Sequence, residues 1–234
     1  MFVAVIMGSV WAGTVDDGLV LAEPYRGGRL LGSVPTIPRD AYERAAKGEV
    51  VTGNADTGEK LKRVWGVTVV DVPIDRFWAA LNDDESKPGY SDLTHVELLS
   101  GSACQTGRVV FQYLDVSVLS DRWWVVEQRQ NTSMVSGSSG RVREVTWRSL
   151  DDGESRLNDG AKTWAKKGTQ VPFTEGAWFL VDLGEGKTLV EYVAASDPGG
   201  IVPAGLAASF ASGSIANTFE GMTKLALAGG HCAP

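Results

Sequence analysis

Apolar and polar residues alternate along the middle of the chain in a pattern that predicts strands, with one helix early in the series. Residues 63–73 form a β-branched run that ends at Pro73, and residues 74–83 place apolar side chains at helical spacing. Six further strand-like stretches follow, most of them separated by turns rich in Gly or Asp. These stretches are residues 94–101, 107–119, 121–130, 142–150, 176–184 and 187–197.

The last segment, residues 203–228, is predicted to be a long amphipathic helix. Its apolar residues recur at spacings of three or four and therefore share one helical face. A curved sheet must cover its apolar face, and this helix is the only predicted element long enough to do so. We therefore predict an α+β fold in which a curved antiparallel β-sheet wraps around the C-terminal α-helix, leaving room for an apolar ligand.

Residues 1–60 are predicted to be an N-terminal extension of a main domain that spans residues 61–230. Residues 38–48 have the composition of a short helix that ends at a glycine, whereas residues 13–34 are Gly-rich and are predicted to be irregular. The extension is expected to pack on the domain or to exchange with a partner chain.

The first twelve residues, MFVAVIMGSVWA, are apolar but too short to span a bilayer, which takes about 20 residues. The run is compatible with the end of a signal peptide cleaved after Ala12, although it lacks a positive charge, and also with a β-strand or a disordered start. A secreted or periplasmic location and a cytoplasmic one both stay open, and an integral membrane protein is not expected. Cys104 and Cys232 can pair only in an oxidising compartment, so their pairing also stays open.

Charge and motif content exclude several functional classes. The 234-residue chain has a formal net charge of -7 and no Lys/Arg cluster, so we expect no nucleic-acid partner. Its two Cys and two His have no zinc-ligand spacing, so no metal site is predicted. No P-loop, GxGxxG or GxSxG motif is present, so we expect no cofactor and predict no catalytic residue.

Three phrases resemble the START/Bet v 1-like superfamily, also called SRPBCC or helix-grip, and they occur in its order. Residues 71–83 (DVPIDRFWAALND) are similar to its opening strand and helix. Residues 120–125 (SDRWWV) are similar to the START "sdRD.v" segment, with Trp123 where an acidic residue often stands. Residues 176–206 are similar to its closing segment, with the turn, the DPGG and the following Pro in register. The resemblance covers roughly residues 62–228.

The resemblance implies a helix-grip fold that binds or transfers an apolar small molecule, such as a lipid, sterol, quinone or polyketide, in an internal cavity. A minority of the superfamily are cyclases or hydrolases, so the alternative is a cyclase- or dehydratase-type enzyme on the same fold. Residues 41–51 also resemble a leader found before some bacterial members. A domain with a filled core that binds a protein partner is a third interpretation.

Strand alternation selects the residues that would face this cavity, because alternate residues share one face. Polar neighbours such as Glu191 and Arg148 indicate that the apolar set faces inward, to line the cavity or to pack a solid core. Phe111 and Tyr113 alternate with apolar neighbours, which leaves their face less decided. The ligand-cavity candidates are Phe111, Tyr113, Trp124, Val145, Trp147, Trp178, Leu180, Val190, Tyr192, Ile215, Phe219 and Met222.

A few polar residues are candidates for chemistry. Arg122 is the polar cavity candidate, and it is expected to pair with a carboxylate inside the fold or to meet a ligand head group. Glu127 and Glu144 are predicted to lie on a solvated face rather than to act as an acid–base pair. His95 has no orienting partner in the sequence and is not expected to be catalytic.

Two segments are candidates for controlling access to the cavity. They are the insertion at residues 151–174, which contains Trp164, Lys166 and Lys167, and the loop at residues 83–93. A transient membrane contact fits this role. We expect a monomer, although no pattern in the chain bears on the oligomeric state.

Overall fold

The computed structural model describes residues 8–55, 61–116, 120–199 and 204–233, with backbone alone at residues 8–13 and 204–214. Within these ranges nine strands form one sheet in the order β1-β2-β9-β8-β6-β5-β4-β3, and β7 pairs with β5. All pairings are antiparallel except that of β7. The strands are β1 (Val51–Ala55), β2 (Arg63–Val70), β3 (Leu93–Ser100), β4 (Arg108–Leu114), β5 (Arg122–Gln130), β6 (Val142–Ser149), β7 (Thr169–Gln170), β8 (Phe173–Gly184) and β9 (Lys187–Asp197).

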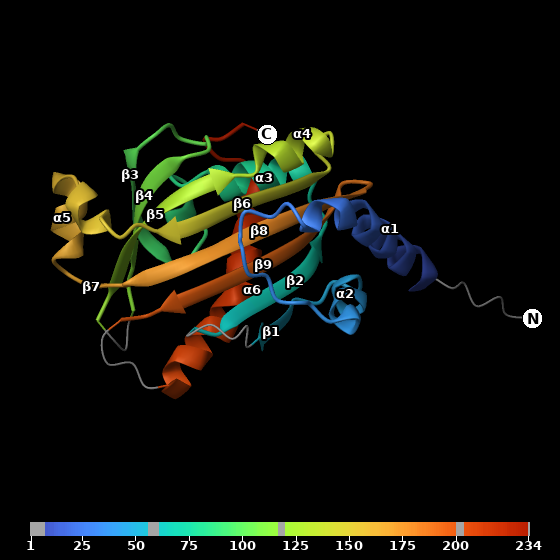
Figure 1. Ribbon diagram of the computed structural model, residues 1–234, viewed down its shortest axis with the longest axis horizontal. Helices are drawn as coiled ribbons and strands as arrows, with labels where there is room; N and C mark the ends of the chain where they lie inside the picture. Colours follow the sequence, from blue (N-terminus) through green and yellow to red (C-terminus); the bar gives the residue numbers. More distant parts are fainter. Residues whose placement is uncertain (1–7, 56–60, 117–119, 200–203, 234) are drawn as a thin grey trace, which may run out of the picture.

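Helices surround the sheet on both faces (Figure 1). The α-helices are α1 (Gly8–Arg26), α2 (Arg39–Ala45), α3 (Ile74–Asn82), α4 (Thr132–Gly137), α5 (Asp159–Ala165) and α6 (Ala204–Ala228), with short 3-10 helices η1 (Lys87–Gly89) and η2 (Gly153–Arg156). From β2 onward the order is the predicted one: a strand, a helix, six long antiparallel strands and a long final helix. The predicted α+β helix-grip architecture is therefore confirmed.

The concave face of the sheet packs against α3 and α6, and in Figure 1 α6 runs behind the strands. Two glycines allow α6 to approach closely. A Cβ at Gly66 in β2 would lie 2.6 Å from Ile215 and 2.7 Å from Phe219, and a Cβ at Gly221 in α6 would overlap the backbone oxygen of Tyr90. The helix is thus held directly against β2 on one side and the loop after η1 on the other.

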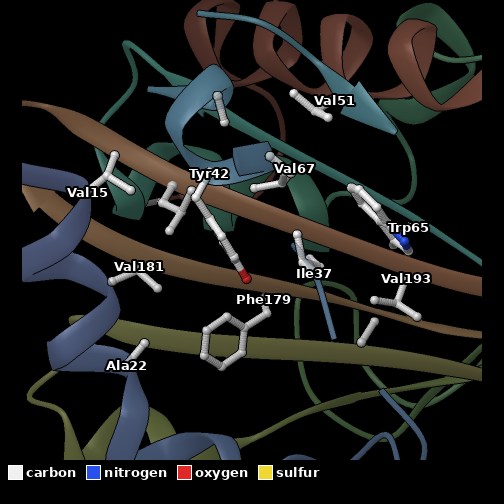
Figure 2. Packing of buried hydrophobic residues seen from close by; sticks show 14 of the residues in the cluster. Val15, Ala22, Ile37, Tyr42, Val51, Trp65, Val67, Phe179, Val181 and Val193 are labelled. Carbon is white, nitrogen blue, oxygen red and sulfur yellow. The ribbon is translucent and has the colours of Figure 1, made fainter. Parts of the chain in front are cut away.

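The convex face is covered by the first part of the chain (Figure 2). Buried residues of α1 and α2, including Val15, Ala22 and Tyr42, share a hydrophobic core with Phe179 and Val181 of β8. The prediction of irregular structure at residues 13–34 was wrong for residues 13–26, which belong to α1, and is confirmed for residues 27–34, which form neither helix nor strand. The many glycines suggested a loop, but the helix is stabilised by the apolar face that it buries on the sheet.

Buried ion pairs fasten this extension to the convex face. Arg29 donates to Glu144 at 2.8 Å, and Arg26 donates to Glu191 at 2.6 Å. Tyr42 donates its hydroxyl to Glu191 at 2.8 Å. Both glutamates are 0% exposed, so the prediction that Glu144 lies on a solvated face was wrong. Strand alternation correctly placed these carboxylates on the face opposite Trp178, but the extension that covers them is encoded more than 100 residues away.

The insertion at residues 151–174 is structured rather than a simple loop. It contains η2, α5 and β7, and it packs on the convex face of β4 and β5. The connection between β5 and β6 contains α4. The Asn131 side chain caps this helix by accepting a hydrogen bond from the backbone N–H of Met134.

The C-terminal end of α6 is tied to the rest of the domain in two ways. A disulfide joins Cys104, in the loop between β3 and β4, to Cys232, with their Cα atoms 5.7 Å apart. The buried carboxylate of Asp83 also accepts hydrogen bonds from the backbone N–H groups of His231 and Cys232. Among the described residues, no helix has the length and apolar character that a bilayer crossing requires.

Candidate functional site

The concave face under α6 is the candidate site, and the strand register places its residues. Trp178 of β8 lies between Val145 of β6 and Tyr192 of β9, and Leu180 pairs with Val190. These residues belong to or pack against one buried cluster with the inward face of α6. The sequence candidates in this cluster are Val145, Trp147, Trp178, Leu180, Val190, Tyr192, Ile215, Phe219 and Met222.

Aromatic rings form the centre of this face. The Trp178 ring packs edge-on against Tyr192 with centroids 4.7 Å apart and against Phe219 at 5.4 Å. Trp147 stacks on the other side of the group with its centroid 5.5 Å from that of Tyr192. Phe77 of α3, which was not among the candidates, completes the group at 6.2 Å from Trp178. Such pairs stabilise a preformed apolar wall.

Gly176 of β8 creates the space that the Trp147 ring occupies. A Cβ at this position would overlap the indole of Trp147 and the backbone oxygen of Val193. The missing side chain lets Trp147 lean across β8 towards Tyr192 on β9. The sequence places this glycine at the start of the predicted strand 176–184, and only the strand pairing reveals its role.

The Tyr192 hydroxyl has no hydrogen-bond partner among the residues that the structure describes, and burial raises its pKa above the usual value. Part of the Tyr192 and Trp147 side chains nevertheless remains accessible, although both lie on the face that α6 covers. The hydroxyl is not among the described fully buried polar atoms that lack a partner, so it keeps accessible surface and a donor that can meet an acceptor.

A row of hydroxyls continues the concave face beyond the aromatic rings. Ser196 donates to the Thr174 hydroxyl at 2.7 Å, and the Trp147 indole N–H donates to the same oxygen at 3.4 Å. The Ser149 hydroxyl donates to the backbone oxygen of Thr174 at 3.2 Å. This end of the face is therefore polar but uncharged, and its hydroxyls are largely occupied with one another.

Arg122 lies on the concave face by register but forms no ion pair with a carboxylate of the described residues. Its Nε donates to the backbone oxygen of Pro198 at 2.8 Å, and its Nη1 donates to the backbone and side-chain oxygens of Ser120. Carbonyl dipoles therefore replace a carboxylate as partners of this buried guanidinium. Its donors are directed at the chain after β9, which fixes that segment to the start of β5.

Phe111 and Tyr113 lie on the convex face, so their prediction as cavity residues was wrong. They belong to a separate cluster with Trp123, covered by α5. Apolar residues on both sides of β4 concealed the correct face, because Val110 is also 0% exposed. Between Phe111 and Tyr113 in β4, Gln112 lies on the concave side. Its Oε1 accepts a 2.6 Å hydrogen bond from the indole N–H of Trp124.

His95 has a partner that the sequence did not reveal, but on the convex side. Its Nε2 lies 2.7 Å from Glu97 Oε1, and its ring stacks on Trp164 of α5 with centroids 4.6 Å apart. Nearby, burial and the hydrogen bond to Asp121 raise the pKa of Tyr113 to about 12. These contacts attach α5 to the sheet and do not converge with the residues under α6.

A buried charged group lies where α3 meets β4 and β5. Arg108, which is 0% exposed, donates to Asp84, Asn82 and Gln128. Lys87 donates to Asp84 at 2.5 Å. Burial lowers the pKa of Lys87, whereas the two cations lower the pKa of Asp84 despite its burial. Each charge has a partner within the group, which therefore braces this side of the concave face.

A pocket of about 550 Å³ lies elsewhere, between α1, α2 and the end of β2. Val15, Tyr42 and Val69 contribute apolar surface, and Asp16, Arg39 and Glu43 surround them with charges of both signs. None of the residues predicted from the sequence lines this pocket. Among the described residues, no group of three His, Cys, Asp or Glu side chains is arranged to hold a metal ion.

No family model and no curated protein sequence matches the chain. Solved structures do resemble it, among them a STAR-related lipid transfer protein from Xanthomonas axonopodis, with a TM-score of 0.60 and 17% identity over 83% of this chain and 98% of that one. Human StAR-related lipid transfer protein 5 has a TM-score of 0.59 and 13% identity over 95% and 97% of the two chains. The chain has the START/Bet v 1-like fold.

An enzyme also shares this START-like fold. The Zhui aromatase/cyclase from Streptomyces has a TM-score of 0.51 and 15% identity over 71% of this chain and 94% of that one. Lipid-transfer proteins and a cyclase thus resemble the chain at similarly low identity. These likenesses show the fold alone, and the residues of the concave face must decide between binding and catalysis.

Proposed function

We propose that this protein binds or transfers an apolar small molecule held between the concave face of the sheet and α6. The observation that carries the proposal is the aromatic group of Trp147, Trp178 and Tyr192 under α6. Two of its rings keep accessible surface although the helix covers their face. Rings that only fill a core would be expected to lose that surface to close packing.

The driving force for binding would be the transfer of apolar ligand surface out of water. This contributes about 25 cal/mol per Å² before the costs of association are subtracted. Solved structures of lipid-transfer proteins with this fold support the same general role.

Binding is favoured over catalysis because the polar candidates do not converge. A cyclase or dehydratase would need at least one acid or base close to the reacting atoms, inside the cavity. His95 and Tyr113 lie on the opposite face, and the Arg122 donors are occupied by carbonyl groups. Tyr192 alone remains, and a single phenol without a partner makes a weak proton-transfer site.

The test is native mass spectrometry of the purified protein, followed by organic extraction and identification of what is released. We expect one apolar molecule per chain. Trp147→Ala should lower this occupancy, whereas Trp164→Ala, which removes a partly exposed indole from α5, should leave it unchanged. A ligand-free protein that also takes up no fluorescent lipid would contradict the proposal.

An oxidising compartment is the location that the disulfide favours, because cytosolic thiols are kept reduced. Cys104 and Cys232 pair across the C-terminal end of α6. The proposal is tested by trapping the protein from its native cells with a thiol-alkylating reagent. Alkylation of Cys104 and Cys232 before any reductant is added would contradict an oxidising compartment. Alkylation of these cysteines only after reduction would support it.

A single chain suffices for the proposed site, so a monomer is still expected, and transient contact with a membrane would serve ligand exchange. Light scattering tests the first expectation and flotation with lipid vesicles the second. A stable dimer, or binding to vesicles that persists through flotation, would contradict them.

A further inference from the structure

The cations of the concave face are all engaged by the protein itself. In the described strands, three arginines occupy positions on this face: Arg108, Arg122 and Arg143. Arg108 is bound by Asp84, and Arg143 by Asp75 and the backbone oxygen of Gly140. Arg122 is bound by backbone and serine oxygens. Each of these arginines is therefore already bound by acceptors of the protein itself.

The remaining neighbourhood does not supply a cation either. Residues 200–214, which connect β9 to α6 and form its first turns, contain no Lys, Arg or His. On the described part of α6, Lys224 pairs with Glu220 one turn away, and both side chains are exposed. A phosphate or carboxylate placed between the sheet and α6 would therefore be buried without a counter-charge, which is strongly unfavourable.

A neutral hydrogen-bond donor is available in the same place. Tyr192 lies in the middle of the aromatic group, its ring held by Trp147, Trp178 and Phe219. Its hydroxyl has no acceptor among the described residues, although the neighbouring hydroxyls of Thr174 and Ser196 are bonded to each other. An O–H group in this position is satisfied by a neutral oxygen, such as a hydroxyl or a carbonyl group, without any charge being buried.

We propose that the ligand is a neutral, oxygenated apolar molecule whose hydroxyl or carbonyl oxygen accepts a hydrogen bond from Tyr192, and that ligands with a phosphate, sulfate or carboxylate head are excluded. This inference rests on the proposed binding function. It narrows the ligand class to molecules such as alcohols, esters, ketones or diacylglycerols. A free fatty acid and a phospholipid with an anionic head fall outside that class.

The experiment measures the affinity for pairs of probes that differ only in the head group, by equilibrium dialysis at mildly alkaline pH. The pairs are a long-chain alcohol and the corresponding fatty acid, a diacylglycerol and the phosphatidic acid with the same chains, and a sterol and its sulfate. In at least one pair the neutral probe should bind, and its anionic counterpart should bind more weakly by about tenfold or more. Equal or tighter binding of the anionic probe in a pair that binds would overturn the inference and leave the proposed function standing.

Tyr192→Phe removes the donor and keeps the ring. Its affinity for the neutral oxygenated probe should fall by about threefold to tenfold, the usual net effect of one hydrogen bond. Its affinity for an alkane of the same length should not change. Tyr25→Phe is the matched control, because the Tyr25 hydroxyl donates to the backbone oxygen of Gly137 on the convex side.

The possible failures are distinguishable. If Tyr192→Phe binds oxygenated probes as well as the wild type does, the assigned hydrogen bond is wrong. If the folded wild type binds none of the probes, whether neutral, anionic or alkane, the proposed function fails, and the inference fails with it.

Discussion

Arg29 Nε donates a hydrogen bond to Glu144 Oε1 across 2.8 Å, although 115 residues separate the two in the chain. Both side chains are almost fully buried, at 4% and 0% exposure. The same guanidinium lies 4.5 Å from the centre of the Phe179 ring on β8. One side chain of the extension is thus bound by both the charged and the aromatic part of the convex face.

Removal of Arg29 should therefore destabilise the whole domain. Arg29→Met leaves Glu144 buried without its cation, and we expect the free energy of unfolding to fall by about 3–5 kcal/mol. Arg44→Met is the control, because its partner Glu49 is exposed and such pairs contribute about 1 kcal/mol or less. Urea denaturation followed by tryptophan fluorescence measures both. Equal effects of the two substitutions would contradict a structural role for the buried pair.

Acid should weaken the fold through Glu191. Burial by itself would raise the pKa of this carboxyl, but the hydrogen bond and charge of Arg26, with Arg29 and Tyr42, lower it below the usual value. A lowered carboxyl pKa stabilises the folded state above the unfolded-state pKa of about 4.3, and this contribution is lost as the pH falls through the folded pKa. We expect the free energy of unfolding to decline below about pH 4.

Glu191→Gln tests the origin of this decline, because the amide cannot titrate. Denaturation curves at a series of pH values should give a shallower acid dependence for the variant than for the wild type. The variant should also be less stable at neutral pH, since Arg26 then loses its counter-charge. If the free energy of unfolding depends on pH equally in the variant and in the wild type, carboxylates other than Glu191 cause the acid sensitivity.

Gly176→Ala should disturb the aromatic group on the concave face. The added methyl group overlaps the Trp147 ring and the backbone of β9, so we expect a loss of about 1–3 kcal/mol and a displaced indole. Gly32→Ala is the control, because no atom lies within 4 Å of the added Cβ. Near-ultraviolet circular dichroism reports the position of the ring. An unchanged aromatic spectrum would contradict the packing of Trp147 over Gly176.

Reduction of the Cys104–Cys232 bond should lower stability substantially. The bond closes a loop with a sequence separation of 128, and a cross-link of that length is worth about 4–5 kcal/mol in the chain-entropy model. Thermal unfolding with and without dithiothreitol measures the effect. The double variant Cys104→Ser/Cys232→Ser should unfold at the lower temperature in both conditions, and a response of this variant to the reductant would point to a different cause.

The arrangement of strands and the final helix could be predicted from the sequence because their signals are local. Period-two alternation identified Trp178 and Tyr192 as residues of one face, and both lie in the concave group. The same signal failed in β4, where Val110 and Phe111 are both 0% exposed. A strand covered on both faces has no polar side, so alternation cannot tell which face belongs to the site.

The roles of the charged residues could not be predicted, because each depends on a partner distant in the chain. Glu144 and Glu191 have the pattern of solvated strand residues, and only the docking of α1 and its following segment makes them buried. Arg122 was expected to pair with a carboxylate or to meet a ligand head group, and it donates to the carbonyl of Pro198. Nothing local to a residue encodes which backbone groups the fold will bring to it.

The long range of the contacts between the extension and the sheet also has a consequence for how the chain is made. Arg26 contacts Glu191, 165 residues further on, so α1 cannot reach its binding surface until the β8–β9 hairpin has been completed. Contacts of such large sequence separation slow folding. The nascent chain therefore lacks its native convex face until these strands have been made, a period in which chaperones can still engage it.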